Sequence, residues 1–172
     1  YPYKKAPFAS IVKLLGGIVI AEEYDLDRMI ALKENVDAEG NGIDLEVGEM
    51  TVTKDLLGAA LVGSKNDAMY ALAQNYPGGM NAFVTRLQEK AAEIGMKDTS
   101  IVNPIGLDDP EQYSTPRDIA LLMIVAMRNP IIAEIIGNTS YMLVTEDGRQ
   151  EIVWATNTLL NDVPGVIGGK TG

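Results

Sequence analysis

Ser10 and Lys13 stand three positions apart at the start of an apolar run. Residues spaced in this way share one face of a helix, so the hydroxyl and the amine can meet. Such a pair suits acyl transfer, in which serine attacks a carbonyl carbon and lysine takes the hydroxyl proton. The same spacing also arises when a serine caps a helix and a lysine follows one turn later, so the pair alone leaves both interpretations open.

The chain contains no histidine and no cysteine. These absences exclude every Ser/His/Asp triad, thiol nucleophiles, thiolate metal sites and disulfides. A serine nucleophile would therefore need lysine or a carboxylate as its base. Lys13 could serve only if its pKa fell from ~10.4 to about 7 or 8, which requires roughly 3 to 5 kcal/mol from its surroundings. Burial, the positive end of its own helix and a neighbouring cation all act in that direction.

Two further motifs follow in the chain. Ser64-Lys65-Asn66 has the form S-x-N, and the chain ends with Lys170, Thr171 and Gly172 as K-T-G. Taken singly, Ser64 and Asn66 could end one helix and cap the next, and Lys170 could be a terminal charge. Together with S-x-x-K, the motifs stand in the order found in penicillin-binding proteins.

With these motifs the chain resembles the D-alanyl-D-alanine carboxypeptidases, low-molecular-mass penicillin-binding proteins that share a fold with serine β-lactamases. The likeness extends through "LVGSKNDAMYALA", "KAAEIGMKDTSIVNPIGLDDPEQYSTPRDIALL" and "TNTLLNDVPGVIGGKTG", so it covers nearly the whole chain. It implies a serine-type carboxypeptidase that trims peptidoglycan stem peptides through an acyl-serine. β-Lactams would be covalent inhibitors, no metal or organic cofactor would be needed, and the protein would work outside the cytoplasmic membrane.

The resemblance also implies a role for each motif residue. Ser10 would be the nucleophile and Lys13 its base, and Ser64 would relay a proton toward the leaving D-alanine. Asn66 would hold Lys13 or the substrate amide, and the K-T-G residues would bind the terminal carboxylate of the peptide. The implied substrate-binding residues are Asn66, Lys170, Thr171 and Gly172.

Two features depart from the family pattern. The family most often has a small residue where this chain has Lys65, and we expect that side chain to point outward. The strands that flank the third motif in the family's antiparallel sheet lie before S-x-x-K and after K-T-G. We therefore expect an α/β (α+β) chain with a β-lactamase/transpeptidase-like fold, mostly its helical part. Residues 1–172 would form a single catalytic domain that is truncated at both ends.

The truncation has an expected chemical consequence. In the family one oxyanion donor is the backbone N–H of the nucleophile, and the other comes from just beyond K-T-G. Loss of one such donor typically costs ~10² to 10³ in rate. We therefore expect the segment alone to be weak or inactive.

Composition limits the partners. A chain of 172 residues with 47% hydrophobic content supports one core. The net charge of −10 argues against nucleic acid and anionic membrane surfaces as partners. Nowhere do 18 apolar residues run together, so membrane anchoring is not visible in this chain.

Local patterns predict the elements that must position the motifs. We expect a buried helix over 10–24 with Ser10 as N-cap, and a loop at 39–42 followed by a short strand through Ile43, Leu45 and Val47. Thr51 or Thr53 would cap the next helix, and an irregular surface loop would occupy 99–115. The remaining predictions are helices at 54–63, 67–76, 79–95, 115–129 and from Pro130 to about 137, a hairpin turning at Asp147-Gly148, and an extended C-terminus.

Two other functions compete with a carboxypeptidase. A serine β-lactamase of class A needs a glutamate in an E-x-x-x-N type loop, but no asparagine stands at that spacing after Glu111. A non-catalytic domain that binds peptidoglycan peptides would tolerate loss of nucleophile or base, whereas all the motif residues are present. Asp108, Asp109 and Glu111 look like a carboxylate cluster, but a solvated acidic loop is the interpretation that we favour.

Overall fold

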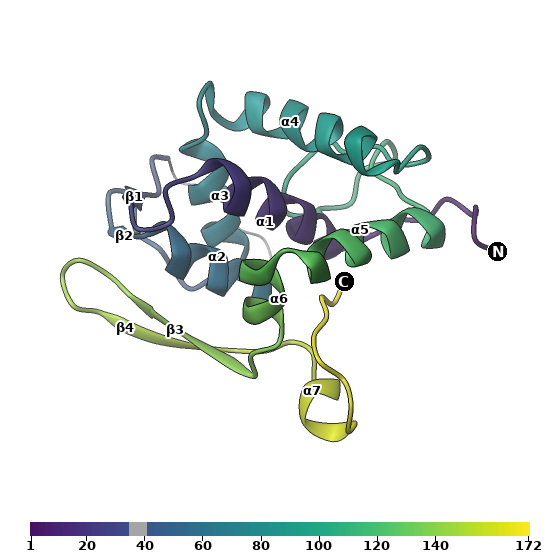
Figure 1. Ribbon diagram of the computed structural model, residues 1–172. Coiled ribbons are helices and arrows are strands. Elements are labelled where there is room, and N and C mark those ends of the chain that lie inside the picture. Colours follow the sequence, from purple (N-terminus) through teal and green to yellow (C-terminus); the bar gives the residue numbers. More distant parts are fainter. Residues whose placement is uncertain (35–40) are drawn as a thin grey trace.

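The structure is a computed structural model of the chain that describes residues 1–34 and 41–172. Helices dominate it, and Figure 1 shows them gathered around α1 with a long hairpin on one side. In chain order the elements are a 3-10 turn η1 (Ala9–Ile11), α1 (Val12–Glu23), β1 (Met29–Ala31), β2 (Met50–Val52), α2 (Thr53–Val62), α3 (Asn66–Gln74), α4 (Gly79–Ile94), α5 (Pro116–Arg128), α6 (Pro130–Ile136), β3 (Ser140–Val144), β4 (Gln150–Trp154) and α7 (Leu159–Asp162).

Helix α1 is the centre of the core. All of its residues from Val12 to Ile20 are buried, and α2, α3, α4, α5 and α6 each contact it. A helix that is apolar on all sides needs such a position, because no face of it suits water. The buried helix predicted over 10–24 is thus confirmed, and the one charged side chain within its buried part is Lys13.

The predicted caps of two helices are wrong. Ser10 lies in η1 ahead of α1, and its hydroxyl contacts Lys13 Nζ instead of a backbone N–H of the helix. Helix α2 begins at Thr53 without a side-chain cap. The hydroxyl of Thr51 donates to Val144 O and that of Thr53 to Arg28 O. The hydroxyls of Thr51 and Thr53 are thus taken by tertiary partners and that of Ser10 by a side chain of the adjoining helix α1, so none of them caps a helix.

The other helix predictions are confirmed. On α4 the side chains of Phe83, Leu87 and Ala91 are fully buried, and Gly95 ends the helix in the left-handed conformation with φ 88°. Thr115 caps α5 by accepting from the N–H of Asp118, and a proline opens that helix. No single helix in the described parts of the chain is long and apolar enough to cross a bilayer, and α5 and α6, which qualify only as a pair, are bent by 104°.

The strand predicted through Ile43, Leu45 and Val47 is wrong. Ile43 and Leu45 are buried as the alternation suggests, but the regular strand β2 is confined to Met50–Val52, where it pairs with β1. The N–H groups of Ile43 and Leu45 donate instead to the carboxylate of Asp67, at 2.8 and 3.2 Å. A buried carboxylate thus replaces a neighbouring strand. Residues 39 and 40 of the predicted loop lie outside the described residues.

The hairpin predicted at Asp147-Gly148 is confirmed. Strands β3 and β4 pair antiparallel, with Leu143 and Val153 on the buried side. Beyond β4 the N–H of Thr156 donates to Val62 O, which brings the chain back to the end of α2 and the S-x-N turn. The last residues then run extended until Gly172 lies against Phe8 and Ile11 (Figure 1). The fold is therefore mixed helix and strand, with few strands in the described residues, as expected.

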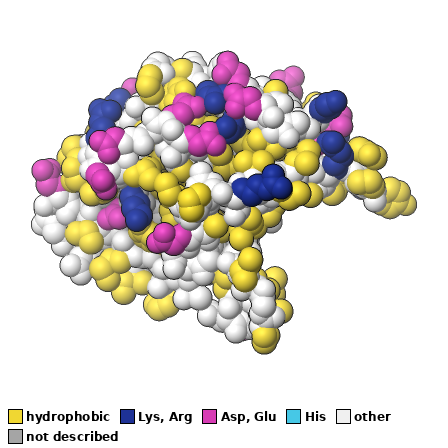
Figure 2. Space-filling view, viewed as in Figure 1, with side chains coloured by type: hydrophobic (Ala, Val, Ile, Leu, Met, Phe, Trp, Pro, Cys, Tyr) yellow, Lys and Arg dark blue, Asp and Glu magenta, His cyan; other side chains and the backbone are white. Residues whose placement is uncertain are grey.

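Charged side chains of opposite sign are mixed on the face shown in Figure 2. On α4, Arg86 pairs with Glu23 and Glu93, and Lys90 pairs with Glu22. The pairs with Glu22 and Glu23 join α4 to the C-terminal end of α1, whereas the pair with Glu93 lies within α4. Because they are exposed, each contributes little to stability, and the apolar core carries the fold.

Asp118 fixes the beginning of the 99–115 loop to α5. The side chain is 0% exposed and accepts from the N–H of Asp98 at 2.8 Å and from the hydroxyl of Thr99 at 2.9 Å. The guanidinium of Arg117 lies 3.2 Å from its other oxygen. The beginning of the loop is therefore held in place against α5.

We predict that Asp118→Ala lowers the free energy of unfolding by about 3 kcal/mol, because two buried donors lose their acceptor. Urea unfolding of the purified protein measures this. The exposed Asp108, in the same loop, provides the control, and Asp108→Ala should change stability by less than about 0.5 kcal/mol. Equal losses in the two variants would contradict the anchoring role.

Candidate active site

The side chains of Ser10 and Lys13 meet at the junction of η1 and α1. Lys13 is 0% exposed, and its Nζ lies 2.7 Å from Ser10 Oγ. The same Nζ donates to the backbone carbonyl of Ile105, also at 2.7 Å. Because η1 runs directly into α1, the residues at i and i+3 lie on the same face of the helical turn. The contact that the sequence made possible is therefore present.

Burial lowers the pKa of Lys13 from 10.5 to about 7, and the positive charge of Lys170 acts in the same direction. This is the range that a lysine base requires near neutral pH. A neutral amine has two N–H groups and one lone pair. One N–H can remain on Ile105 O while the lone pair faces the Ser10 hydroxyl. Desolvation is the larger of the two causes, so the packing around α1 sets the basicity.

The 99–115 loop forms one wall of this site. It is irregular, as predicted, but Ile105 is buried, so the prediction of a surface loop is wrong for its central part. Gly106 has φ +91° and lies directly against the backbone of Ala9 and Ser10. Asn103 fixes this turn, because its side-chain oxygen accepts from the N–H of Gly106 at 2.8 Å and of Leu107 at 3.0 Å.

Ser64 occupies the turn between α2 and α3 and is 7% exposed. Its φ of 59° places it in the left-handed region, which is uncommon for a residue other than glycine. Lys170 Nζ donates to Ser64 Oγ at 2.8 Å. Burial lowers the pKa of Lys170 from 10.5 to about 8. The second and third motifs are thus joined by a direct hydrogen bond.

A cleft of about 280 Å³ unites the three motifs. Lys13 and Lys170 each contact a serine that lines it. The structure therefore brings all seven predicted site residues to one place. The residues that line the cleft are Ser10, Asn41, Ser64, Asn66, Thr156, Thr171 and Gly172.

Sequence reasoning missed Asn41, Thr156 and Ile105. Thr156 forms a hydroxyl–hydroxyl contact with Thr171. Ile105 contributes its backbone carbonyl, which any residue type would offer, so the residue type at this position gives no sign of its role. We expected Lys65 to point outward; it is not among the described residues that line the cleft, but it does not extend into solvent either. Its side chain is half-buried, and Nζ donates to Asn41 Oδ1 and to Gly42 O, both at 2.9 Å.

A serine hydroxyl against a buried amine of lowered pKa, with a second serine held by another lysine, defines a serine–lysine acyl-transfer type of site. A family model described as D-alanyl-D-alanine carboxypeptidase matches residues 2–172. The chain belongs to this family, Peptidase S11. The fold class expected from sequence, a transpeptidase-like α+β fold, is confirmed by the structural relatives below.

Among curated relatives, the D-alanyl-D-alanine carboxypeptidase DacB2 of Mycobacterium tuberculosis is 36% identical over 169 residues, which are 96% of this chain and 57% of that protein. DacF of Bacillus subtilis is 31% identical over 170 residues, 95% of this chain and 44% of that protein. The chain thus spans about half the length of these relatives.

Among solved structures, a D-alanyl-D-alanine carboxypeptidase from Mycobacterium tuberculosis superposes with a TM-score of 0.90 at 33% identity, over 99% of this chain and 65% of that one. The Streptomyces K15 DD-transpeptidase gives a TM-score of 0.90 at 25% identity, over 99% of this chain and 72% of that one.

We predict that Gly106→Ala slows acylation of Ser10 by a β-lactam about 100-fold or more, because displacing reacting groups by about 1 Å can cost that much. The new Cβ would stand 2.2 Å from the carbonyl carbon of Ala9 and 2.6 Å from the nitrogen of Ser10. The measurement is the rate of covalent labelling by a fluorescent penicillin.

Gly148 offers a matched control, since it has the same φ of +91° but nothing within 4 Å of the added Cβ. Gly148→Ala should carry the same backbone strain and label at the wild-type rate. If both variants label equally slowly, close approach to Ser10 is not the reason for the glycine.

Proposed function

We propose that the polypeptide containing this chain is a serine-type D-Ala-D-Ala carboxypeptidase that trims peptidoglycan stem peptides outside the cytoplasmic membrane. β-Lactams would acylate the same serine. The observation that carries the proposal is the 2.7 Å contact between Ser10 Oγ and the amine of Lys13, whose pKa burial lowers to about 7. Membership of the D-alanyl-D-alanine carboxypeptidase family supports the choice of substrate.

Acylation begins when Ser10 Oγ attacks the carbonyl carbon of the penultimate D-alanine. The hydroxyl proton passes to the lone pair of Lys13 Nζ, and an ester bond forms as charge develops on the carbonyl oxygen. The resulting ammonium keeps its hydrogen bond to Ile105 O, which becomes charge-assisted and stronger. The carbonyl of Ile105 therefore stabilises the base most when it carries the proton.

Ser64 is suited to protonate the leaving group. Because Lys170 Nζ donates to Ser64 Oγ, the hydroxyl proton of Ser64 is directed elsewhere and can pass to the departing nitrogen. The proton that Lys13 took from Ser10 would then return to Ser64 Oγ across the cleft that both serines line, which restores Ser64 and the neutral amine. The C–N bond then breaks and D-alanine leaves as an amine. Lys170 and Thr171 would bind the substrate's terminal carboxylate, and Asn66 would hold an amide. Water finally hydrolyses the ester and restores Ser10.

The cleft argues against β-lactam hydrolysis as the physiological task. Among the described residues that line it there is no carboxylate to activate water, and Glu111 is exposed on its loop. We therefore propose a slowly hydrolysed penicillin adduct.

A purely binding domain is also disfavoured, because burying the amine of Lys13 has a free-energy cost that binding alone would not require.

An endopeptidase acting on cross-linked stem peptides is the second candidate. A protein of Pseudomonas aeruginosa named D-alanyl-D-alanine endopeptidase is 38% identical to this chain over 131 residues, 74% of this chain and 42% of that protein. Both reactions share the acyl-serine step and differ in the group that leaves. Supplying a D-Ala-D-Ala pentapeptide and a cross-linked dimer side by side separates them.

We predict that the full-length polypeptide releases D-alanine from the pentapeptide and that Ser10→Ala lowers turnover by a factor on the order of 10⁴ or more. Mass spectrometry should find a penicillin adduct on Ser10 that lasts for minutes. Residues 1–172 alone should react more slowly, because the oxyanion donor expected beyond K-T-G is not among them. Wild-type turnover in the Ser10→Ala variant would refute the proposal.

We predict a bell-shaped pH dependence of kcat/KM, with the midpoint of the rising limb near pH 7 and that of the falling limb near pH 8. The rate rises as Lys13 loses its proton and becomes a base, with a pKa of about 7. It falls as Lys170 loses the charge that would bind the substrate carboxylate, with a pKa of about 8.

Lys170→Met tests the assignment of the two limbs. The variant should lose the falling limb, and its rising limb should move to higher pH, because the charge of Lys170 lowers the pKa of Lys13. An unchanged rising limb would contradict this electrostatic coupling. Lys4→Met, at an exposed position near the N-terminus, serves as the control.

A further inference from the structure

We propose that Lys65 is a positioning residue that acts through Asn41 to hold Ser64, and one wall of the cleft, in the geometry of acyl transfer. The inference rests on the proposed function and adds to it a residue outside the motif positions to which the chemistry is assigned. It starts from the middle position of S-x-N, where this chain carries a long cationic side chain.

Lys65 acts from behind the cleft. Its Nζ donates to Asn41 Oδ1 and to Gly42 O at 2.9 Å each, and Lys65 is not among the described residues that line the cleft. Asn41 does line it. A cation held by two carbonyl oxygens of one short segment fixes that segment, so any effect of Lys65 on substrate must pass through Asn41.

Asn41 is bound to the S-x-N turn through both ends of its side chain and through its backbone. Its Nδ2 donates to Gly63 O at 2.7 Å and approaches Ser64 O at 3.3 Å. Its backbone carbonyl accepts from the N–H of Asn66 at 2.7 Å. Lys65 sets the orientation of the amide. An ammonium group can only donate, so it pairs with Oδ1 and leaves the NH₂ group to donate to the two carbonyls.

This orientation matters because Ser64 is strained. With φ 59° it occupies a conformation that costs a residue other than glycine about 1 to 2 kcal/mol. The donor from Asn41 binds the carbonyls on both sides of the Cα of Ser64. Without it the turn can relax, and Ser64 Oγ would leave its place against Lys170 Nζ.

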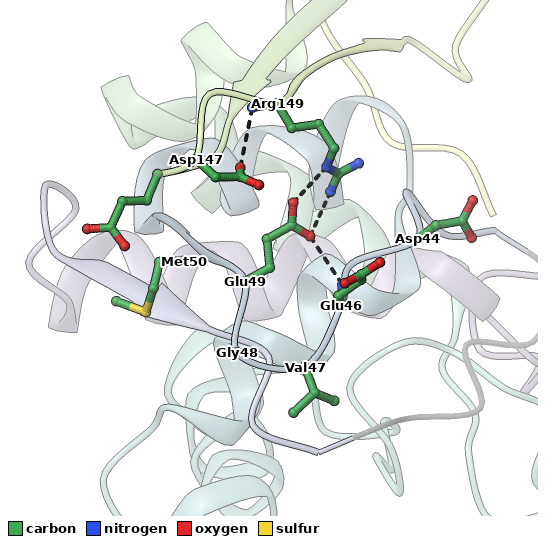
Figure 3. A pocket seen from close by; sticks show the side chains of 9 residues that line it. Asp44, Glu46, Val47, Gly48, Glu49, Met50, Asp147 and Arg149 are labelled. Atoms are coloured by element: carbon green, nitrogen blue, oxygen red, sulfur yellow. Dashed lines mark hydrogen bonds and ion pairs between the residues drawn. The ribbon is translucent and has the colours of Figure 1, made fainter.

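From Ile43 onward, the segment that follows Asn41 is anchored independently of Lys65, whose contacts are with Asn41 and Gly42. Asp67 accepts from two of its N–H groups, and Arg149 donates to Ile43 O at 3.1 Å. The guanidinium of Arg149 faces the carboxylate of Glu49 (Figure 3). Its Nε and Nη2 lie 2.6 and 2.9 Å from the carboxylate oxygens. Loss of Lys65 should therefore release the amide of Asn41 while the rest of the segment stays in place.

The test compares Lys65→Met with Lys65→Arg in the full-length polypeptide. Met keeps the length and removes the donors, and we expect kcat for the pentapeptide and the penicillin acylation rate to fall about tenfold with KM within twofold. Arg can donate to both carbonyls and should restore most of the rate. Lys33→Met is the matched control, since exposed Lys33 also donates to a backbone carbonyl, that of Gln74, and this variant should keep wild-type kinetics.

A double variant decides whether Lys65 acts through Asn41. Asn41→Ala should slow acylation at least as much as Lys65→Met, and adding Lys65→Met to it should cause no further loss. Additive losses would overturn the proposal. A raised KM with unchanged kcat in Lys65→Met would also overturn it, because that result would mean that Lys65 binds substrate directly.

A structural readout separates this proposal from the proposed function. The side-chain NH₂ of Asn41 should give a shifted, slowly exchanging NMR signal in wild type and in Ser10→Ala, and lose that protection in Lys65→Met. If wild type releases no D-alanine and binds no penicillin, the proposed function fails whatever this signal does. If turnover is normal and Lys65→Met leaves the signal unchanged, the positioning role of Lys65 is refuted while the proposed function stands.

Discussion

The burial of one amine is the constraint on which the site depends. The decrease in the pKa of Lys13 from 10.5 to about 7 corresponds to roughly 5 kcal/mol between its two protonation states. That energy comes chiefly from desolvation, which is why α1 has to be enclosed by five other helices. Burying this lysine costs folding stability at neutral pH, because the unfolded chain would hold the proton that the buried amine gives up. In return, the amine has a lone pair available beside Ser10 Oγ.

The segments around this amine are irregular but fixed. The 99–115 loop and the segment after Asn41 form no regular sheet, so their backbone groups need other partners. Side chains supply them. Asn103 accepts from N–H groups within the loop, Asp118 accepts from the N–H of Asp98 just before it, and Asp67 accepts from N–H groups of the segment. This arrangement lets the non-repetitive backbone of the loop reach the beginning of α1, and it places functional groups on loops that a rigid helical scaffold positions.

Two lysines of lowered pKa have different neighbours and hence different chemistry. Lys13 contacts a carbonyl and the hydroxyl of Ser10, so as a neutral amine it can take a proton. Lys170 donates to Ser64 and to its own neighbour's carbonyl, Thr171 O, and its higher pKa leaves it charged over more of the neutral range. The repulsion between the two ammonium groups widens the difference between their pKa values, because the charge that stays on Lys170 disfavours charge on Lys13.

The sequence by itself determined the three motifs and their order, the need for a neutral lysine in a chain without histidine, the helices that carry the motifs, and the hairpin at Asp147-Gly148. These features are local, since periodicity, caps and turn residues act over a few positions. Only the tertiary structure decided that Ser10 contacts Lys13 instead of capping its helix, that Ile105 O holds the amine, and that Lys65 clamps Asn41. The contacts of Ile105 and Lys65 join groups from distant parts of the chain, among them backbone carbonyls that every residue type possesses, so no pattern of side chains could predict them. Spacing made the contact of Ser10 with Lys13 possible, but the packing of the surrounding chain decided between that contact and a helix cap.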